Sequence, residues 1–279
     1  MERTLVPLAA KRGLEVHGEG KGSVELANLI RAGFRSPDVF ISADPVVIDS
    51  LMGAPNGNLV SWYSVFGTTR LVLAYSPASP YKESFLDVAR SRRSLVDVLS
   101  QPHLHLGRTD PALDPKGYRT IIAMRLLERY AHVAGLAERV LGDDRNPAQV
   151  LPAGGPLLVR LESGDIDAAF VYSTESVERN LPALELPKQV NLGDAREAKT
   201  YATVSVTIDG KKHVGAPAAY ALTIPSAAPN RAAAAEFIAF LLSGDGRAVL
   251  ARGGMTVLAR VQVVGNRDAI PTSLQSVLR

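Results

Sequence analysis

The chain has 279 residues, of which 46% are hydrophobic and 21% charged, a composition typical of a folded protein with a substantial core. Its 31 Lys and Arg residues against 28 Asp and Glu residues leave a formal net charge of only +3, without dense basic clusters. This balance argues against a nucleic-acid-binding protein that grips phosphates. No apolar run of about 18 residues predicts a membrane span. The absence of cysteine excludes thiolate nucleophiles, disulfides and iron–sulfur clusters.

The first seventy residues alternate between predicted helices and strands, which is the pattern of a doubly wound α/β sheet. Helices are predicted over residues 2–11, 24–30 and 46–51, and strands over residues 14–17 and 38–42. Ser23 closes a glycine-rich turn and is the expected N-cap of the second helix, while Asp44 is the expected N-cap of the third.

A second α/β set follows from about residue 71. Strands are predicted over residues 71–75, 103–107, 166–172 and 218–224, and helices over residues 94–99, 117–134, 155–163 and 232–242. An Asp-Gly turn at Asp209 and Gly210 predicts a hairpin between residues 204–208 and the strand that starts at Lys211.

Two extended apolar stretches, near residues 75–77 and 217–224, bracket the middle of the chain, as hinge segments between two lobes would. The expected fold is therefore two doubly wound α/β lobes joined by a hinge, with a ligand in the cleft between them. Lobe 1 is expected to comprise residues 1–76 and 217–279, and lobe 2 residues 77–216.

Polar candidates gather in four predicted strand-to-helix loops. The loop at 20–23 offers backbone amides and a hydroxyl at a helix start, which suits an anion but equally suits a plain capped helix. The loop at 42–45 is best explained by an Asp44 cap. The loop at 107–120 is the least ordinary, since two Asp-Pro steps precede Tyr118 and Arg119. The loop at 170–178 runs from a strand into a helix with a glutamate in its first turn.

These loops favour binding over catalysis. The sequence contains no nucleophile elbow, phosphate loop, dinucleotide fingerprint or zinc-protease motif. His103 and His105 are spaced for one face of a strand, and a solvated pair is the preferred interpretation over a metal site.

Several sequence motifs appear in an order that resembles the molybdate/tungstate-binding proteins of ABC transporters, especially the tungstate-binding branch first known from archaea. The resemblance extends in order from about Gly22 to the C-terminus. The matching segments are residues 22–23, 38–44, 106–111, 114–119, 161–172, 184–187, 190–192, 203–206, 221–225, 228–230, 236–243 and Gly246.

The resemblance implies a periplasmic-binding-protein-like receptor, without enzymatic activity or cofactor, which is exported to the periplasm or the cell surface. It implies capture of the oxyanion tungstate or molybdate, hinge closure near residues 75–77 and 217–220, and delivery to a membrane permease. A monomer that binds no nucleic acid is expected.

The resemblance also implies roles for individual residues. Ser23 would donate a hydroxyl hydrogen bond, and Tyr172 would donate its phenol from the other lobe. Backbone amides near Lys116 and around Pro156 and Leu157 would complete the cage. In the tungstate branch an aspartate and a glutamate approach the metal centre itself. Asp114 matches the aspartate, and Glu178 matches the glutamate if one residue is inserted, with Glu175 as the alternative.

The start of the chain departs from the family pattern. Family members begin with an apolar strand and an Ala-Gly-Ser-Leu-type loop, whereas this sequence begins at what resembles the following helix. We expect an exported protein whose signal segment precedes this numbering, with one anion contact missing. The alternatives are a receptor for sulfate, phosphate or a small carboxylate, an enzyme on the same fold, and a cytosolic sensor domain. An Arg119 side chain that points into the anion pocket would favour the first of these.

Overall fold

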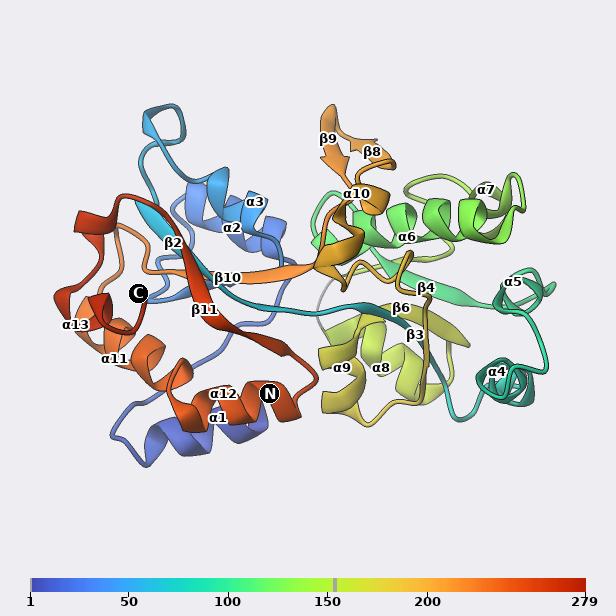
Figure 1. Cartoon of the computed structure of the whole chain (residues 1–279), viewed down its shortest axis with the longest axis horizontal. Helices are drawn as coiled ribbons and strands as arrows, with labels where there is room; N and C mark the ends of the chain where they lie inside the picture. The colour runs from blue at the N-terminus through green and yellow to red at the C-terminus, as the bar shows by residue number, and fades with distance from the viewer. Residues whose placement is uncertain (1, 153–154) are drawn as a thin grey trace. The chain divides into compact units, whose positions relative to one another are not determined.

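The computed structural model describes residues 2–152 and 155–279, which form two compact units (Figure 1). Unit 1 combines the residues up to Thr69 with Ala218–Arg279, and unit 2 is the continuous segment Arg70–Pro217. Each unit contains both helices and a β-sheet, as expected from the alternating sequence pattern.

The first crossing between the units lies earlier than the expected boundary at residues 76–77. Strand β3 (Leu71–Tyr75) pairs with two strands of unit 2, so the chain has already left unit 1 at Thr69. The return crossing follows Pro217. The Thr69 amide donates a hydrogen bond to the Ala218 carbonyl at 3.0 Å, so the two strands of unit 1 that lead to the crossings are paired at their ends.

The sheet of unit 1 has four strands, and each pairs antiparallel with its neighbour. Its order is β1 (Phe40–Ser42), β10 (Ala219–Thr223), β2 (Trp62–Thr68) and β11 (Thr256–Gly265). Alternation along β2 sends Trp62 and Phe66 into one apolar core and Tyr63 and Val65 into another. The sheet is therefore covered on both faces.

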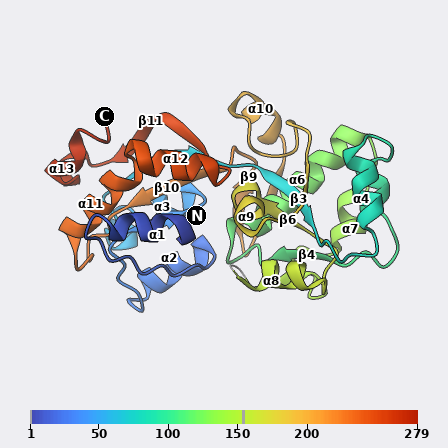
Figure 2. The same cartoon turned by 90° about the horizontal axis from the view of Figure 1, so that it is seen from below.

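The helices of unit 1 divide between these two cores. The Trp62 core contains side chains of α1, α11, α12 and α13, whereas the Tyr63 core contains those of α2 and α3. Helices α1 and α12 lie side by side in both views (Figures 1 and 2). The bounds are α1 (Glu2–Ala10), α2 (Ser23–Arg31), α3 (Pro45–Asp49), η1 (Ala54–Asn56), α11 (Arg231–Leu241), α12 (Gly244–Arg252), η3 (Arg267–Ala269) and α13 (Thr272–Gln275).

The strand expected over residues 14–17 is not formed. Leu14 and Val16 pack against the Trp62 core, while Glu15 and His17 are exposed and contact each other. The residues therefore alternate in burial as a strand would, but they pair with no neighbouring strand, so the periodicity misled the prediction.

The sheet of unit 2 has five strands in a mixed arrangement. Its order is β5 (Val150–Leu151), β4 (Leu106–Thr109), β6 (Ala168–Tyr172), β3 and β7 (Ala183–Glu185). Strands β5, β4 and β6 are parallel, whereas β3 runs antiparallel to β6 and β7. The predicted hairpin is confirmed as β8 (Ser205–Ile208) and β9 (Lys211–Val214), with positive φ at both Asp209 and Gly210.

The helices of unit 2 cover this sheet, and two of them begin near the carboxyl ends of β4 and β6. Because β4 and β6 are parallel neighbours, the starts of α6 and α9 come to the same edge of the sheet. The bounds are α4 (Lys82–Ala89), α5 (Leu95–Leu99), α6 (Pro115–Ala131), α7 (Leu136–Leu141), α8 (Gly155–Ser163), α9 (Ser173–Arg179), η2 (Ala195–Glu197) and α10 (Ala198–Tyr201). Within the described segments, no helix has the length and apolar character needed to cross a membrane.

Candidate functional site

The two Asp-Pro steps of the β4–α6 loop have one local explanation. Asp114 Oδ1 accepts a hydrogen bond from the Lys116 amide at 2.9 Å, and Asp110 Oδ1 accepts one from the Ala112 amide at 2.8 Å. Each aspartate thus satisfies the amide two residues ahead, across a proline that has none to offer. Asp114 is buried and is the N-cap of α6. This loop therefore fixes where α6 begins.

Lys116, in the first turn of α6, carries a buried ammonium. Its side chain is only 2% exposed, and Nζ lies 2.6 Å from Glu175 Oε1 on α9. The other oxygen of the same carboxylate accepts a hydrogen bond from the Tyr172 amide at 2.9 Å. Glu175 consequently joins the start of α6 to the carboxyl end of β6.

Arg119 lies one helical turn beyond Lys116 and is also buried. Its Nη1 atom donates a hydrogen bond to the Tyr172 hydroxyl at 2.8 Å. The Lys116 ammonium lies 5.9 Å from the centroid of the Tyr172 ring, and the Arg119 guanidinium lies 6.0 Å from it. The phenol at the end of β6 is therefore flanked by two buried cations.

Burial and charge act in opposite directions in this cluster. Burial alone would lower the pKa of Lys116, but attraction to Glu175 and Asp114 and the hydrogen bond to Glu175 raise it above its ordinary value. Burial raises the pKa of Asp114, against the attraction of Lys116 and the hydrogen bond from its amide. Lys116 therefore stays charged at neutral pH, which is the state that a binding site for an anion requires.

The structure brings together four of the residues that the sequence singled out, namely Asp114, Lys116, Tyr172 and Glu175. Glu178 lies on the exposed side of α9. Pro156 is exposed and has no amide proton, so only Leu157 of that pair could donate a backbone hydrogen bond. The Leu157 side chain lies fully buried in the apolar core beneath α8.

Ser23, in unit 1, is not the N-cap that the sequence predicted. Helix α2 begins at Ser23 itself, its N-cap is Gly22, and no side chain caps it. The buried Ser23 hydroxyl instead accepts a hydrogen bond from the Ala43 amide at 3.0 Å. Ala43 belongs to the loop before α3. In the same loop Asp44 is the N-cap of α3, as predicted, because its side chain accepts a hydrogen bond from the Val46 amide.

His103 and His105 do not lie on a strand, contrary to the prediction. His103 has a φ of 65°, which is a left-handed turn conformation. The strand predicted over residues 103–107 instead begins at Leu106 and ends at Thr109. His103 and His105 are both exposed. Across residues 2–152 and 155–279, no group of three or more His, Asp or Glu side chains is arranged to hold a metal ion.

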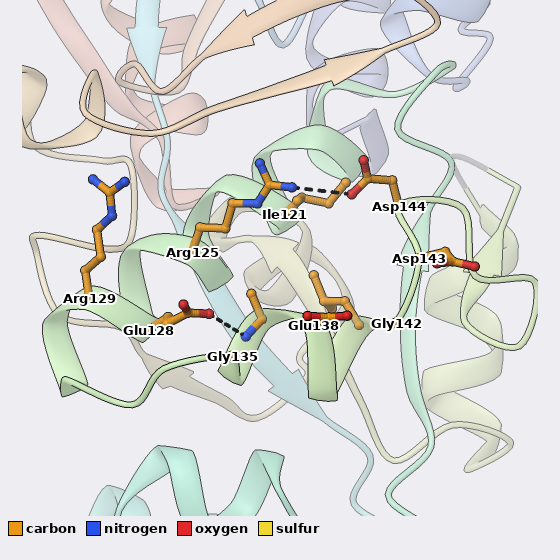
Figure 3. Close-up of a pocket in the computed structure, with 11 residues that line it drawn as sticks. Ile121, Arg125, Glu128, Arg129, Gly135, Glu138, Gly142, Asp143 and Asp144 are labelled. Atoms are coloured by element: carbon orange, nitrogen blue, oxygen red, sulfur yellow. Dashed lines mark hydrogen bonds and ion pairs between the residues drawn. The ribbon is translucent and has the colours of Figure 1, made fainter.

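A pocket of about 500 Å³ lies elsewhere in unit 2, between α6 and α7 (Figure 3). Arg125 lies 3.8 Å from Asp144, and the Glu128 carboxylate accepts a hydrogen bond from the Ala137 amide at 3.0 Å. None of the residues that the sequence predicted for the site lines this pocket. Its lining carries both charges, as the cluster around Tyr172 does, but no residue is common to the two.

The sequence did not predict the contact of Arg119 with Tyr172. For Lys116 it predicted a role of the backbone amide and not of the side chain. One local signal was available. Lys116 and Arg119 are spaced i, i+3 in the first turns of a helix, where the helix dipole disfavours cations, and apolar residues follow directly. Such a local conflict is expected at a functional site.

The two α/β units have the fold class of the periplasmic solute-binding proteins, as similarity to solved structures shows. The structure is similar to the periplasmic molybdate-binding protein of Azotobacter vinelandii, with a TM-score of 0.60, 16% identity and coverage of 92% of this chain and 94% of that one. It is also similar to the sulfate-binding protein SubI of Mycobacterium tuberculosis, with a TM-score of 0.57, 12% identity and coverage of 92% and 82%. At these identities the likeness confirms the expected fold and carries nothing about the ligand.

Residues 4–256 match the family described as bacterial extracellular solute-binding protein, and the chain belongs to this family. It is 34% identical over 273 residues to an uncharacterized solute-binding protein of Petrotoga mobilis, covering 96% of this chain and 82% of that protein. It is 28% identical over 270 residues to the molybdate/tungstate-binding protein WtpA of Pyrococcus abyssi, covering 89% and 76%.

Proposed function

We propose that this protein captures a tetraoxo dianion, tungstate or molybdate, and delivers it to the permease of an ABC transporter. The observation that carries the proposal is the buried Lys116 ammonium beside Tyr172, the residue to which the family resemblance assigns an anion contact. Arg119 also contacts Tyr172, and an arginine in the pocket would favour another small anion, so sulfate is the competing ligand in the titration below. The likeness to WtpA, a protein named for molybdate and tungstate binding, supports the same ligand class. Paired cations beside a hydroxyl donor suit a small, strongly charged anion.

In this proposal Tyr172 is the anion donor of unit 2. Its hydroxyl oxygen accepts a hydrogen bond from Arg119, and a phenol can accept at its oxygen and donate its proton at the same time. Hydrogen bonding to a guanidinium also polarises the phenol and strengthens it as a donor. Ser23 of unit 1 is the second proposed hydroxyl donor. Its oxygen accepts a hydrogen bond from the Ala43 amide, and a hydroxyl that accepts at its oxygen can still donate its proton to an anion.

We further propose that the anion stays tetrahedral and is held by hydrogen bonds. Asp114 is engaged with the Lys116 amide, and Glu175 is engaged with the Lys116 ammonium and the Tyr172 amide, while Glu178 is exposed. Carboxylates with these partners need no bond to the metal centre. Tungsten X-ray absorption of the loaded protein tests this step: a tetrahedral spectrum supports it, and an expanded coordination sphere would assign a metal bond to Asp114 or one of the two glutamates.

The proposal includes a non-catalytic, monomeric receptor that acts in the periplasm or at the cell surface. The family description as extracellular solute-binding protein supports export and a transport role. The permease is the proposed protein partner.

Calorimetric titration with tungstate, molybdate and sulfate tests the ligand. Tungstate and molybdate have nearly the same radius and the same charge, so a site built for either is expected to bind both. Sulfate is smaller, and the same donors would reach it only through longer hydrogen bonds. Equal or tighter binding of sulfate would contradict the proposal and favour a receptor for another small anion.

A further inference from the structure

The position of Lys116 is unfavourable on local grounds. Its ammonium is 2% exposed and lies in the first turn of α6, where the positive end of the helix dipole opposes a cation. Desolvation opposes it as well. A side chain placed against both effects is held there by specific partners, and these are the carboxylates of Glu175 and Asp114.

Glu175 also makes a contact that does not involve Lys116. Its Oε2 atom accepts a hydrogen bond from the Tyr172 amide at 2.9 Å, which ties the start of α9 to the end of β6. Only the contact of Oε1 with Lys116 Nζ, at 2.6 Å, needs a cation. The ion pair therefore adds something other than the local geometry of α9.

What it adds is a balance of charge beside the proposed anion donor. Two cations, Lys116 and Arg119, flank Tyr172, and two carboxylates, Asp114 and Glu175, offset them. Arg119 donates directly to the Tyr172 hydroxyl, whereas the Lys116 ammonium donates to Glu175. The electrostatic potential at the phenol thus depends on both members of the Lys116–Glu175 pair.

We propose that the Lys116–Glu175 ion pair determines the charge of the anion that Tyr172 binds, with Lys116 favouring dianions over monoanions and Glu175 limiting that preference. This inference rests on the proposed oxyanion function. Coulomb energy scales with the charge of the ligand, so loss of the ammonium weakens a dianion about twice as much as a monoanion of the same shape. Hydrogen-bond donors such as Tyr172 serve both anions and do not discriminate in this way.

Tungstate and perrhenate provide the test, because both are tetrahedral tetraoxo anions of similar size with charges of −2 and −1. The quantity measured is the ratio of their dissociation constants at pH 7.5. Lys116→Met should reduce the preference for tungstate by about tenfold or more, since it also leaves the Glu175 carboxylate without its cation. Glu175→Gln should increase the preference, and Lys116→Arg should retain it.

Lys188→Met is the matched control. Lys188 also belongs to unit 2 and lies 3.7 Å from a glutamate, Glu197, but its side chain is 60% exposed. Removal of this screened charge should leave the ratio within about twofold of the wild-type value.

The outcomes separate the inference from the function on which it rests. A wild-type protein that binds neither tungstate nor molybdate overturns both. A wild-type protein that binds them, with an unchanged tungstate-to-perrhenate ratio in Lys116→Met and Glu175→Gln, overturns the inference alone and leaves the pair a structural role. If thermal melting shows that Lys116→Met does not fold, Glu175→Gln decides: a raised preference supports the inference, and an unchanged one overturns it.

Discussion

The Arg119 guanidinium donates a hydrogen bond to the Tyr172 hydroxyl at 2.8 Å, although 53 residues separate the two in the chain. This contact joins the second turn of α6 to the last residue of β6, and both side chains are buried. It gives Tyr172 a fixed orientation and a cationic neighbour at once. An isolated tyrosine at a strand end would have neither.

Removal of the Tyr172 hydroxyl should therefore weaken anion binding. In Tyr172→Phe we expect tungstate affinity to fall about 10- to 100-fold, because a hydrogen bond to a charged partner is worth roughly 1.5–3 kcal/mol. Calorimetry measures this loss. Tyr130→Phe is the control, since Tyr130 lies on the same α6 helix but is 52% exposed, and it should bind as the wild type does. Unchanged affinity in Tyr172→Phe would remove Tyr172 from the proposed site.

The raised pKa of Lys116 predicts a specific dependence of stability on alkaline pH. Lys116 has a folded-state pKa above its ordinary value of 10.5, so its charged form stabilises the fold fully below pH 10.5. This contribution is lost as pH rises above 10.5 and through the folded-state pKa. The difference in melting temperature between wild type and Lys116→Met should thus be constant from pH 7 to 9 and shrink above pH 10.5.

Subtraction of the variant curve removes the effect of other groups that titrate in the same range. Lys188→Met, which loses an exposed lysine, should show a small difference at every pH. A wild-type advantage over Lys116→Met that persists unchanged at pH 11.5 would mean that the ammonium charge contributes nothing and that only the packing of the side chain matters.

Local chemistry made several elements predictable from the sequence. The Asp209-Gly210 hairpin and the Asp44 cap depend on residues within four positions of each other, and both were confirmed. Strand β3 was predicted correctly because its five residues form an unbroken apolar run, all buried in a strand that pairs with β6 on one side and β7 on the other. Its assignment to a lobe was wrong, since sequence periodicity identifies a strand but not the strands that pair with it.

The remaining elements depend on partners distant in the sequence. β2 is buried on both faces, so it shows no polar alternation, and β11 pairs with it from nearly two hundred residues away. The Lys116–Glu175 contact spans 59 residues and has no local pattern at all. Family resemblance selected Tyr172 and Asp114 for the site, but only the three-dimensional contacts identified the two cations beside them.

Gly117 is predicted to be required at the start of α6 by close approach of the backbone. A Cβ atom at this position would lie 2.6 Å from the Thr109 carbonyl oxygen and 2.6 Å from the Pro111 nitrogen. These are backbone atoms and cannot move aside cheaply, so Gly117→Ala should destabilise the protein by about 1–3 kcal/mol in urea unfolding. It should also weaken anion binding, because Lys116 precedes it.

Gly155→Ala, in the first turn of α8, is the matched control. Apart from Gly155 itself, its chain neighbours and the backbone of its own helix, no atom of the residues that the structure describes lies within 4 Å of a Cβ at that position. This substitution should leave the free energy of unfolding unchanged or raise it by up to about 1 kcal/mol through the higher helix propensity of alanine. Equal effects of the two substitutions would contradict the close packing of the β4–α6 loop.

Arg108 is a further buried cation of unit 2, and we predict a purely structural role for it. Its guanidinium donates hydrogen bonds to the carbonyl oxygens of Asp144 at 2.6 Å and Asp143 at 2.5 Å, which closes the loop after α7. Arg108→Met leaves these part-buried carbonyls without their donor, so we expect a loss of about 1–3 kcal/mol in the free energy of unfolding.

Arg145→Met provides the comparison, because Arg145 lies 2.6 Å from Asp209 but is 48% exposed, and its loss should cost less than about 1 kcal/mol. The folded fraction of Arg108→Met at low temperature should bind tungstate within about twofold of the wild type, since the guanidinium bonds to the loop after α7 rather than to Tyr172 or Lys116. A large loss of affinity in a folded Arg108→Met protein would instead place the loop after α7 in contact with the anion site.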